Sequence, residues 1–207
     1  EIWVKSFLKK NKIEEIKKFT NETNFSSWIV FTFLTTFSTI LFYWKGASPE
    51  LFSDLVFVTA IAIISRIDIK SMYIDGRIIA LAIIIKLFLL LFFSPLEIID
   101  SLAGMLFGAG ILYFVAFFYQ TFRHNPGLGD GDPSVLGLVG MWVGWQGVGS
   151  VILIASISGI LIGGGFLIFN KKKNHEYSNL LKTKIPFAPF LCLGGLMVHF
   201  LYEPFFL

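Results

Sequence analysis

Two segments of this chain place aspartates where apolar stretches begin or end. Asp68 directly follows an apolar stretch, in the run IISRIDIK of residues 63–70. Asp132 lies in the run NPGLGDGDP of residues 125–133, where glycines alternate with aspartates just before the next apolar stretch. Two carboxylates that approach each other cannot both ionise cheaply, so one of them holds a proton. Such a pair suits aspartyl proteolysis, because the ionised member activates water and the protonated member polarises the scissile carbonyl.

The composition indicates what surrounds these segments. Of the 207 residues, 55% are hydrophobic and only 15% are charged. Since soluble domains carry about a quarter of charged residues, we expect a membrane protein rather than a soluble enzyme or a disordered chain. The single cysteine, Cys192, excludes an internal disulfide framework and a four-thiolate zinc site. The net charge of +3 is too small to indicate a nucleic-acid partner.

Apolar stretches recur along the chain at lengths that suit helices crossing a bilayer, which takes about 20 residues. We therefore predict an all-α, polytopic integral membrane protein with about seven transmembrane helices. The fifth and sixth stretches are separated only by the run GWQG of residues 144–147, so they could form one kinked helix, although two helices are favoured. The predicted spans are Ser27–Trp44, Leu51–Ser65, Ile78–Phe93, Leu96–Tyr119, Val135–Trp145, Val148–Phe169 and Pro186–Tyr202.

The basic residues predict how these spans are oriented. Of the 17 lysines and arginines, all but Lys45 and Lys86 lie in segments on one side of the predicted membrane. Because basic loops stay in the cytoplasm, this side is cytoplasmic, and the N-terminus of the chain and both aspartate segments lie there. The basic segments are residues 1–26, 66–77, 120–134 and 170–185.

The first of these segments differs from the rest of the chain. Residues 1–26 interleave apolar side chains with lysines, which predicts a cytoplasmic segment that is either an amphipathic helix on the membrane surface or a solvated loop. Residues 27–207 then form the transmembrane domain. The chain begins without a methionine, which is consistent with a fragment of a longer protein.

Other polar groups receive structural interpretations. Asp54 is among the acidic residues near the outer ends of spans, where we expect water to reach them. The three histidines, His124, His175 and His199, are scattered over different loops and ends. Lys86 interrupts the third span, where a lysine is rare unless it faces protein or water, so we expect it to snorkel or to pair with an acid.

The two aspartate segments resemble those of the type IV prepilin peptidases, membrane aspartyl proteases with a GxGD motif. The run IDIK at residues 67–70 is similar to the family's first catalytic segment. Either Asp130 or Asp132 could end the GxGD motif. The register ending at Asp132 is favoured, because it places the glycines and tryptophans of residues 140–147 at the family's offsets. The run IPFAPFL of residues 185–191 also looks like the start of the family's last span.

This resemblance implies a prepilin leader peptidase in the bacterial inner membrane, with Asp68 and Asp132 as the catalytic dyad at the cytoplasmic face. Its substrates would be type IV prepilins, or the pseudopilins of protein secretion. Removal of their basic leader would need neither a metal nor another cofactor. S-adenosylmethionine is expected as a cofactor only if the chain also methylates the new N-terminal amine. The oligomeric state is not indicated. Supporting or substrate-binding residues are expected at Lys70, Asp75, Gly129, Asp130 and Gly131, with Asp75 and Asp130 holding the lysines of the leader.

Two departures from the family keep an alternative open. The family commonly has a lysine where this chain has Ser134, and a Pro-Asp pair where residues 74–76 read IDG. A catalytically inactive relative that serves as a membrane assembly or scaffold protein is therefore the alternative. A small transporter or channel is less favoured, because apart from Lys86 the middle parts of the predicted spans lack the polar residues that it needs.

Overall fold

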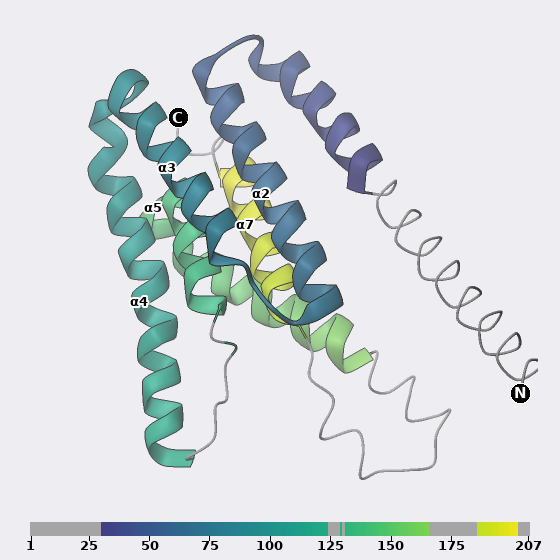
Figure 1. Ribbon diagram of the computed structural model, residues 1–207, viewed down its shortest axis with the longest axis vertical. Coiled ribbons are helices and arrows are strands. Elements are labelled where there is room, and N and C mark those ends of the chain that lie inside the picture. Colours follow the sequence, from purple (N-terminus) through teal and green to yellow (C-terminus); the bar gives the residue numbers. More distant parts are fainter. Residues whose placement is uncertain (1–29, 124–128, 130, 166–185, 203–207) are drawn as a thin grey trace, which may run out of the picture. The chain divides into compact units, whose positions relative to one another are not determined.

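The regular structure of this chain is helical throughout the described residues (Figure 1). The computed structural model describes residues 30–123, 129, 131–165 and 186–202. The predicted surface segment, residues 1–26, lies outside them. The chain divides into two compact units, Glu1–Leu51 and Phe52–Leu207. Both predicted catalytic aspartates belong to the second unit.

Short connections join most of the helices. Residues 30–45 form a helix of the first unit, and α2 (Pro49–Ser71) leads into the second. The second unit continues with α3 (Gly76–Phe93), the 3-10 turn η1 (Pro95–Glu97), α4 (Ile98–Arg123), α5 (Asp132–Ser158), the π-helical turn η2 (Gly159–Gly163) and α7 (Ala188–Tyr202).

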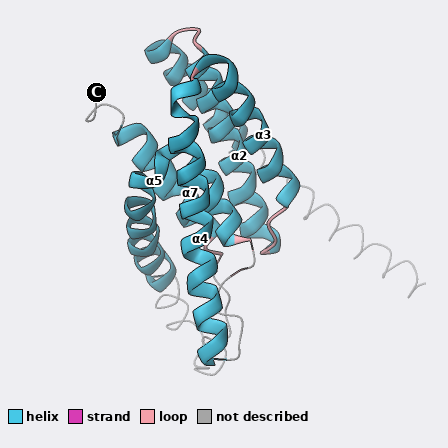
Figure 2. Cartoon of the chain, turned by 90° about the vertical axis from the view of Figure 1, so that its left-hand side faces the viewer, coloured by secondary structure: helices cyan, strands magenta, loops and turns pink. Residues whose placement is uncertain are grey.

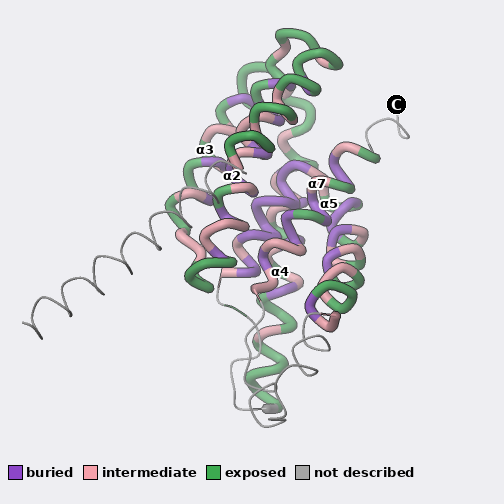
Figure 3. The backbone as a smooth tube through the Cα atoms, turned by 90° about the vertical axis from the view of Figure 1, so that its right-hand side faces the viewer, coloured by how far each residue is buried: buried purple, intermediate pink, exposed green. Residues whose placement is uncertain are grey.

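Three helical stretches among the described residues are long and apolar enough to cross a membrane. They are Gly76–Phe93, Pro95–Phe122 and Asp132–Gly163, and a shorter apolar helix covers Ala188–Leu201. Many large hydrophobic side chains are exposed, as we expect for helices in contact with lipid. Figure 3 shows long stretches of exposed residues along the helices. The all-α membrane class is therefore supported, while the count of seven spans stays a prediction.

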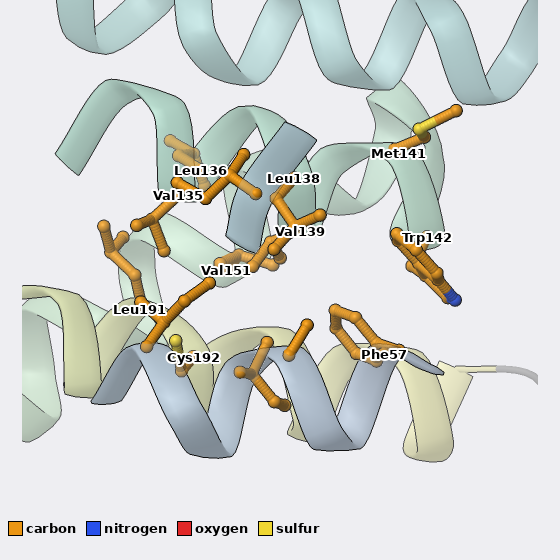
Figure 4. Close-up of a cluster of buried hydrophobic side chains, with 14 of the residues drawn as sticks. Phe57, Val135, Leu136, Leu138, Val139, Met141, Trp142, Val151, Leu191 and Cys192 are labelled. Atoms are coloured by element: carbon orange, nitrogen blue, oxygen red, sulfur yellow. The ribbon is translucent and has the colours of Figure 1, made fainter. Parts of the chain in front are cut away.

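The first half of α5 forms the centre of the second unit. Every residue from Val135 to Trp142 is buried, and α3, α4 and α7 all contact α5. A helix that is apolar on all sides belongs in the interior of a bundle. Figure 4 shows Val139 and Trp142 on the side of α5 that faces Phe57 of α2.

α5 changes direction at Gly144. This glycine has φ of 69° and ψ of 170°, values in the left-handed region that favours glycine. The break lies within residues 144–147, where the sequence predicts the boundary between the fifth and sixth spans. The first half of α5 is therefore a short helix that runs from Asp132 to this break.

Glycines allow α4 and α5 to pack backbone against backbone. A Cβ atom on Gly104 would lie 2.1 Å from the carbonyl oxygen of Gly140, and one on Gly108 would lie 2.5 Å from that of Leu136. Residue 104 thus pairs with residue 140, and residue 108 with residue 136, so the two helices are antiparallel. Four residues further on in this direction, Leu112 of α4 lies at the level of Asp132 of α5. α4 then continues for 11 residues past that level, about 16 Å at 1.5 Å per residue. Figures 1 and 2 show this extension of α4.

We expect Gly104→Ala to loosen this helix pair. The added methyl would overlap the backbone of α5, which cannot move aside as a flexible side chain can, so the free energy of unfolding should fall by about 1–3 kcal/mol. Unfolding with sodium dodecyl sulfate in mixed micelles measures the change. The matched control is Gly110→Ala on the same helix, because no atom lies within 4 Å of its added methyl. Equal losses in the two variants would contradict the packing argument.

Candidate active site

Asp68 lies in the last turn of α2 and is 5% exposed. Its carboxylate accepts a hydrogen bond from the backbone N–H of Ala188, the first residue of α7. The first N–H groups of a helix have no partner within the helix and carry partial positive charge, so this contact stabilises an ionised carboxylate. The Oδ2 atom is also buried and has no hydrogen-bond partner among the described residues. A buried carboxylate oxygen of this kind is costly unless it is protonated or meets water or a substrate.

Asp132 is the first residue of α5 and is also 5% exposed. Its side chain accepts a hydrogen bond from the backbone N–H of Gly129. Its own backbone N–H donates to the carbonyl oxygen of Gly129 at 3.2 Å. The turn before α5 therefore closes on Asp132 from both sides and fixes where its carboxylate lies. An acidic residue in the first turn of a helix is also electrostatically favourable.

A different neighbour excludes a side chain at each of the two glycines of the motif, Gly129 and Gly131. A Cβ atom on Gly129 would lie 2.9 Å from Oδ2 of Asp132, so a side chain there would push the carboxylate aside. A Cβ atom on Gly131 would lie 2.7 Å from side-chain atoms of Ile74. Gly129 thus leaves room for the carboxylate, and Gly131 leaves room for the segment that connects α2 to α3.

The structure brings Asp68 and Asp132 together from α2 and α5. The carboxylates are close enough for the charge of Asp68 to act on Asp132. Both are buried, so salt and water screen their repulsion weakly. A pair that shares one proton avoids most of this repulsion. General acid–base chemistry is the reactivity that such a pair offers.

Two residues that the sequence did not assign to this site border the pair. Cys192 of α7 is 3% exposed, and its thiol forms a hydrogen bond with the side chain of Ser65. Both carboxylates act on Cys192 electrostatically. Ser65 precedes Asp68 by three residues on α2, a helical spacing that could have indicated it, whereas no pattern in the sequence relates Cys192 to α2.

The residues predicted to support the site have different surroundings. Asp75 is the N-cap of α3, and its Oδ1 atom accepts a hydrogen bond from the backbone N–H of Arg77 at 3.0 Å. Lys70 is exposed in the last turn of α2, where a positive charge is favourable. Asp130 lies outside the described residues. Among the residues that the structure describes, no three His, Cys, Asp or Glu side chains gather as a metal site would need.

A second polar contact joins the other ends of α2 and α7. Nε2 of His199 lies 2.8 Å from Oδ1 of Asp54, and the two residues are 7% and 3% exposed. The expectation that water reaches Asp54 is wrong, and His199 is not an isolated histidine. The reason is that α2 and α7 are antiparallel, so the helix that begins beside Asp68 ends beside Asp54.

Lys86 of α3 faces this same region. Its Nζ atom donates a hydrogen bond to Oγ of Ser53 at 3.1 Å and lies 5.3 Å from the ring centre of Trp142. The indole Nε1–H of Trp142 donates to Oγ of Ser53 at 3.1 Å and to its carbonyl oxygen at 3.2 Å. The ammonium group of Lys86 thus contacts protein, one of the two surroundings that the sequence allowed for it.

Comparison with known proteins identifies relatives of this chain in sequence. The sequence model described as the type IV leader peptidase family matches residues 55–164, which include both aspartates of the pair. No solved structure is significantly similar to this chain.

Relatives of this chain carry the name prepilin leader peptidase/N-methyltransferase, and three of them illustrate the similarity. The protein from Burkholderia pseudomallei (strain 1026b) is 31% identical over 110 residues, which are 53% of this chain and 32% of that protein. The protein from Escherichia coli (strain K12) is 31% identical over 105 residues, 51% of this chain and 43% of that protein. The protein from Pseudomonas aeruginosa is 33% identical over 96 residues, 46% of this chain and 31% of that protein. The matched region thus spans less than half of each relative, but the family model covers more than half of this chain. The chain belongs to the type IV leader peptidase family.

Proposed function

We propose that this chain is a membrane aspartyl endopeptidase that removes the basic leader of type IV prepilins or of related pseudopilins. The observation that carries the proposal is the meeting of Asp68 and Asp132, whose carboxylates approach each other from α2 and α5. The membership in the leader peptidase family supports the same class of substrate.

In the proposed mechanism the ionised carboxylate takes a proton from a water molecule, and the resulting hydroxide attacks the scissile carbonyl carbon. The protonated carboxyl group donates a hydrogen bond to the carbonyl oxygen. When the C–N bond breaks, a proton passes to the leaving amine, and the pair returns to its state with one proton. The backbone N–H groups of Ala188 and Gly129 hold the two carboxylates in place during these steps.

The charge distribution supports a cytoplasmic location for this reaction. A prepilin would insert with its basic leader in the cytoplasm and its apolar helix in the membrane, so the bond to be cut would lie near the cytoplasmic surface. The basic segments of this chain predict the same side for Asp68 and Asp132. We propose the bacterial inner membrane as the location and, by family resemblance, cleavage after a glycine that precedes the apolar segment.

The proposal concerns proteolysis alone, which needs no cofactor in this mechanism. The names of the relatives also include an N-methyltransferase. Methylation by this chain, with S-adenosylmethionine as the donor, remains an expectation that depends on a second activity.

The direct test is processing of a purified prepilin by the 207-residue chain in detergent micelles. Mass spectrometry of the product should show one new N-terminus at the border between the leader and the apolar segment. A prepilin whose residue before the cleavage site is changed from glycine to valine is the matched control, and it should remain uncut. A chain that binds prepilin without cutting it would favour the alternative of an inactive assembly or scaffold protein.

We further expect Asp75 and Asp130 to attract the basic leader. Changing both to asparagine should raise KM for a lysine-containing leader by about two- to fivefold, as loss of exposed ion pairs does, and leave kcat unchanged. Asparagine caps a helix about as well as aspartate, so Asp75→Asn keeps the cap of α3 and removes only the charge. Kinetics at low and high salt measure the effect, which should vanish at high salt. An unaltered KM at low salt would contradict this role.

A further inference from the structure

Five residues form a buried polar cluster at the end of the bundle away from the Asp68–Asp132 pair. We call it the Asp54 cluster; its members are Ser53, Asp54, Lys86, Trp142 and His199. Four of them are buried, with 3–7% exposure, and the fifth, Lys86, is half-buried. The ring of Phe57 stacks on Trp142 at 5.1 Å and meets the edge of His199 at 5.4 Å.

The cluster joins the same helices that carry the candidate active site. Asp54 and Asp68 are 14 residues apart on α2, about 21 Å along the helix. On α7, His199 lies 11 residues after Ala188, the residue whose N–H binds Asp68, and this is about 17 Å. Trp142 lies ten residues after Asp132 on α5. α2, α5 and α7 thus each carry one contact of the cluster and one of the site, while Lys86 joins the cluster from α3.

We propose that the Asp54 cluster sets the axial register of α2 against α7 and α5 and so positions the carboxylate of Asp68 against Asp132. This inference rests on the proposed function for its catalytic consequence, but not for its structural content. The members of the cluster are positioning residues, because none of them touches the Asp68–Asp132 pair.

Polar contacts suit this task better than the apolar contacts around them. Lipid tails are as apolar as leucine, so helices in a bilayer gain little from hydrophobic burial, and interhelical hydrogen bonds and close packing decide how they pair. Apolar surfaces tolerate sliding, whereas a buried hydrogen bond is lost when its partners move apart. The contact of Asp54 with His199 is short, buried and directional.

A change of register at the Asp54 cluster would displace Asp68 at the opposite end of α2. Sliding α2 by one helical turn moves Asp68 by about 5.4 Å. That shift would break its contact with the N–H of Ala188 and separate it from Asp132. The hydrogen bond between Ser65 and Cys192 would break as well, because it joins the same two helices at the level of the site.

The Ser65–Cys192 contact provides a test that needs no substrate. Cys192 is the only cysteine of the chain, so Ser65→Cys creates one pair of thiols, with one thiol on α2 and the other on α7. A mild oxidant, copper phenanthroline, removes two electrons and two protons from this pair and forms a disulfide. After quenching and denaturation, a maleimide polymer that adds mass to each free thiol measures the rate of its formation.

We expect cluster variants to slow this disulfide in the Ser65→Cys chain. Asp54→Leu and His199→Leu each remove the hydrogen bond between Asp54 and His199 and place an apolar side chain there, and should lower the rate by about five- to tenfold. Asp54→Asn keeps an oxygen that accepts from Nε2–H of His199, so it should restore most of the rate. If the leucine variants do not accumulate, Ser53→Ala removes only the hydroxyl shared by Lys86 and Trp142 and should slow the disulfide two- to threefold.

The matched control is Val198→Ala, beside His199 on α7. Val198 is 2% exposed, and its truncation loosens packing without removing a polar contact of the cluster. The proposal is supported if Val198→Ala forms the disulfide at close to the unmodified rate while the leucine variants do not. Equal rates in control and cluster variants would overturn it. Failure of the Ser65→Cys chain itself to form the disulfide would also overturn it, because the contact whose register is at issue would then be absent.

Prepilin processing separates this inference from the proposed function. A register change should lower kcat in Asp54→Leu with little effect on KM, and Asp54→Asn should recover kcat as it recovers the disulfide. If the disulfide rates change as expected but no variant or parent chain cuts prepilin, the proposed function fails and the register proposal stands. If prepilin is cut but disulfide and kcat are unaffected by the cluster variants, the register proposal fails alone.

Discussion

Asp68→Asn should abolish prepilin processing, lowering kcat/KM by about a thousandfold or more. Asparagine has nearly the shape of aspartate and can still accept the N–H of Ala188, so the local fold should persist. It cannot hold or release the proton that the pair shares, and Asp132→Asn should fail for the same reason. The measurement is the rate at which the processed N-terminus appears by mass spectrometry.

Two comparisons make this result specific to the pair. Glu97→Gln removes an exposed carboxylate from η1 and should process prepilin at the parent rate. Asp130→Asn tests which GxGD register applies, since the register ending at Asp132 predicts that catalysis survives this change. Loss of kcat in Asp130→Asn together with survival in Asp132→Asn would reverse the assignment of the second catalytic residue.

Gly129→Ala should lower kcat by about a hundredfold while leaving most of the substrate affinity intact. Its added methyl would lie 2.9 Å from Oδ2 of Asp132, closer than carbon and oxygen approach without bonding, so the carboxylate or the turn must move. A displacement of about 1 Å in a reacting group costs about this factor, because proton transfer depends steeply on geometry. Steady-state kinetics, with kcat and KM determined separately, provide the measurement.

Gly149→Ala is the matched control for that substitution. It adds the same methyl to α5 at a place where no atom lies within 4 Å. We expect its kinetics to equal those of the parent, because the change is chemically identical and only the surroundings differ. If Gly129→Ala also retained its kcat, the close approach of Gly129 to the carboxylate would have no catalytic meaning.

The parts of this site that the sequence could predict are those with a local cause. Asp132 stands out because its glycines and the helix that follows are neighbours in the chain. The break in α5 at Gly144 was likewise indicated, since the run GWQG of residues 144–147 interrupts an apolar stretch there. The helical class follows from composition and from the length of the apolar stretches.

Contacts between distant helices could not be predicted in this way. Asp54 and His199 are 145 residues apart, and no sequence pattern near either residue indicates a contact with the other. A carboxylate near the end of an apolar stretch is most simply interpreted as reaching water. Its burial follows from where α7 ends, which depends on the packing of α7 against α5. The place of Cys192 beside the candidate active site could not be predicted for the same reason, because only the packed bundle brings α7 beside Ser65.

The offset between α4 and α5 has a consequence for the lipid around this protein. From Asp100 to the level of Asp132, α4 rises about 18 Å, while a hydrocarbon core is about 30 Å thick. We therefore expect the exposed aromatic side chains of the α4 extension, such as Phe114, Phe118 and Phe122, to occupy the remaining depth of such a core. Acyl chains that cover them would surround the Asp68–Asp132 pair below the headgroups. Because the proposed hydrolysis consumes water, we expect the bilayer next to the start of α5 to be thinner or wetter than the bilayer against α4. We then expect two membrane thicknesses around one protein, and the proposed activity should depend on the length of the lipid chains that adapt to both.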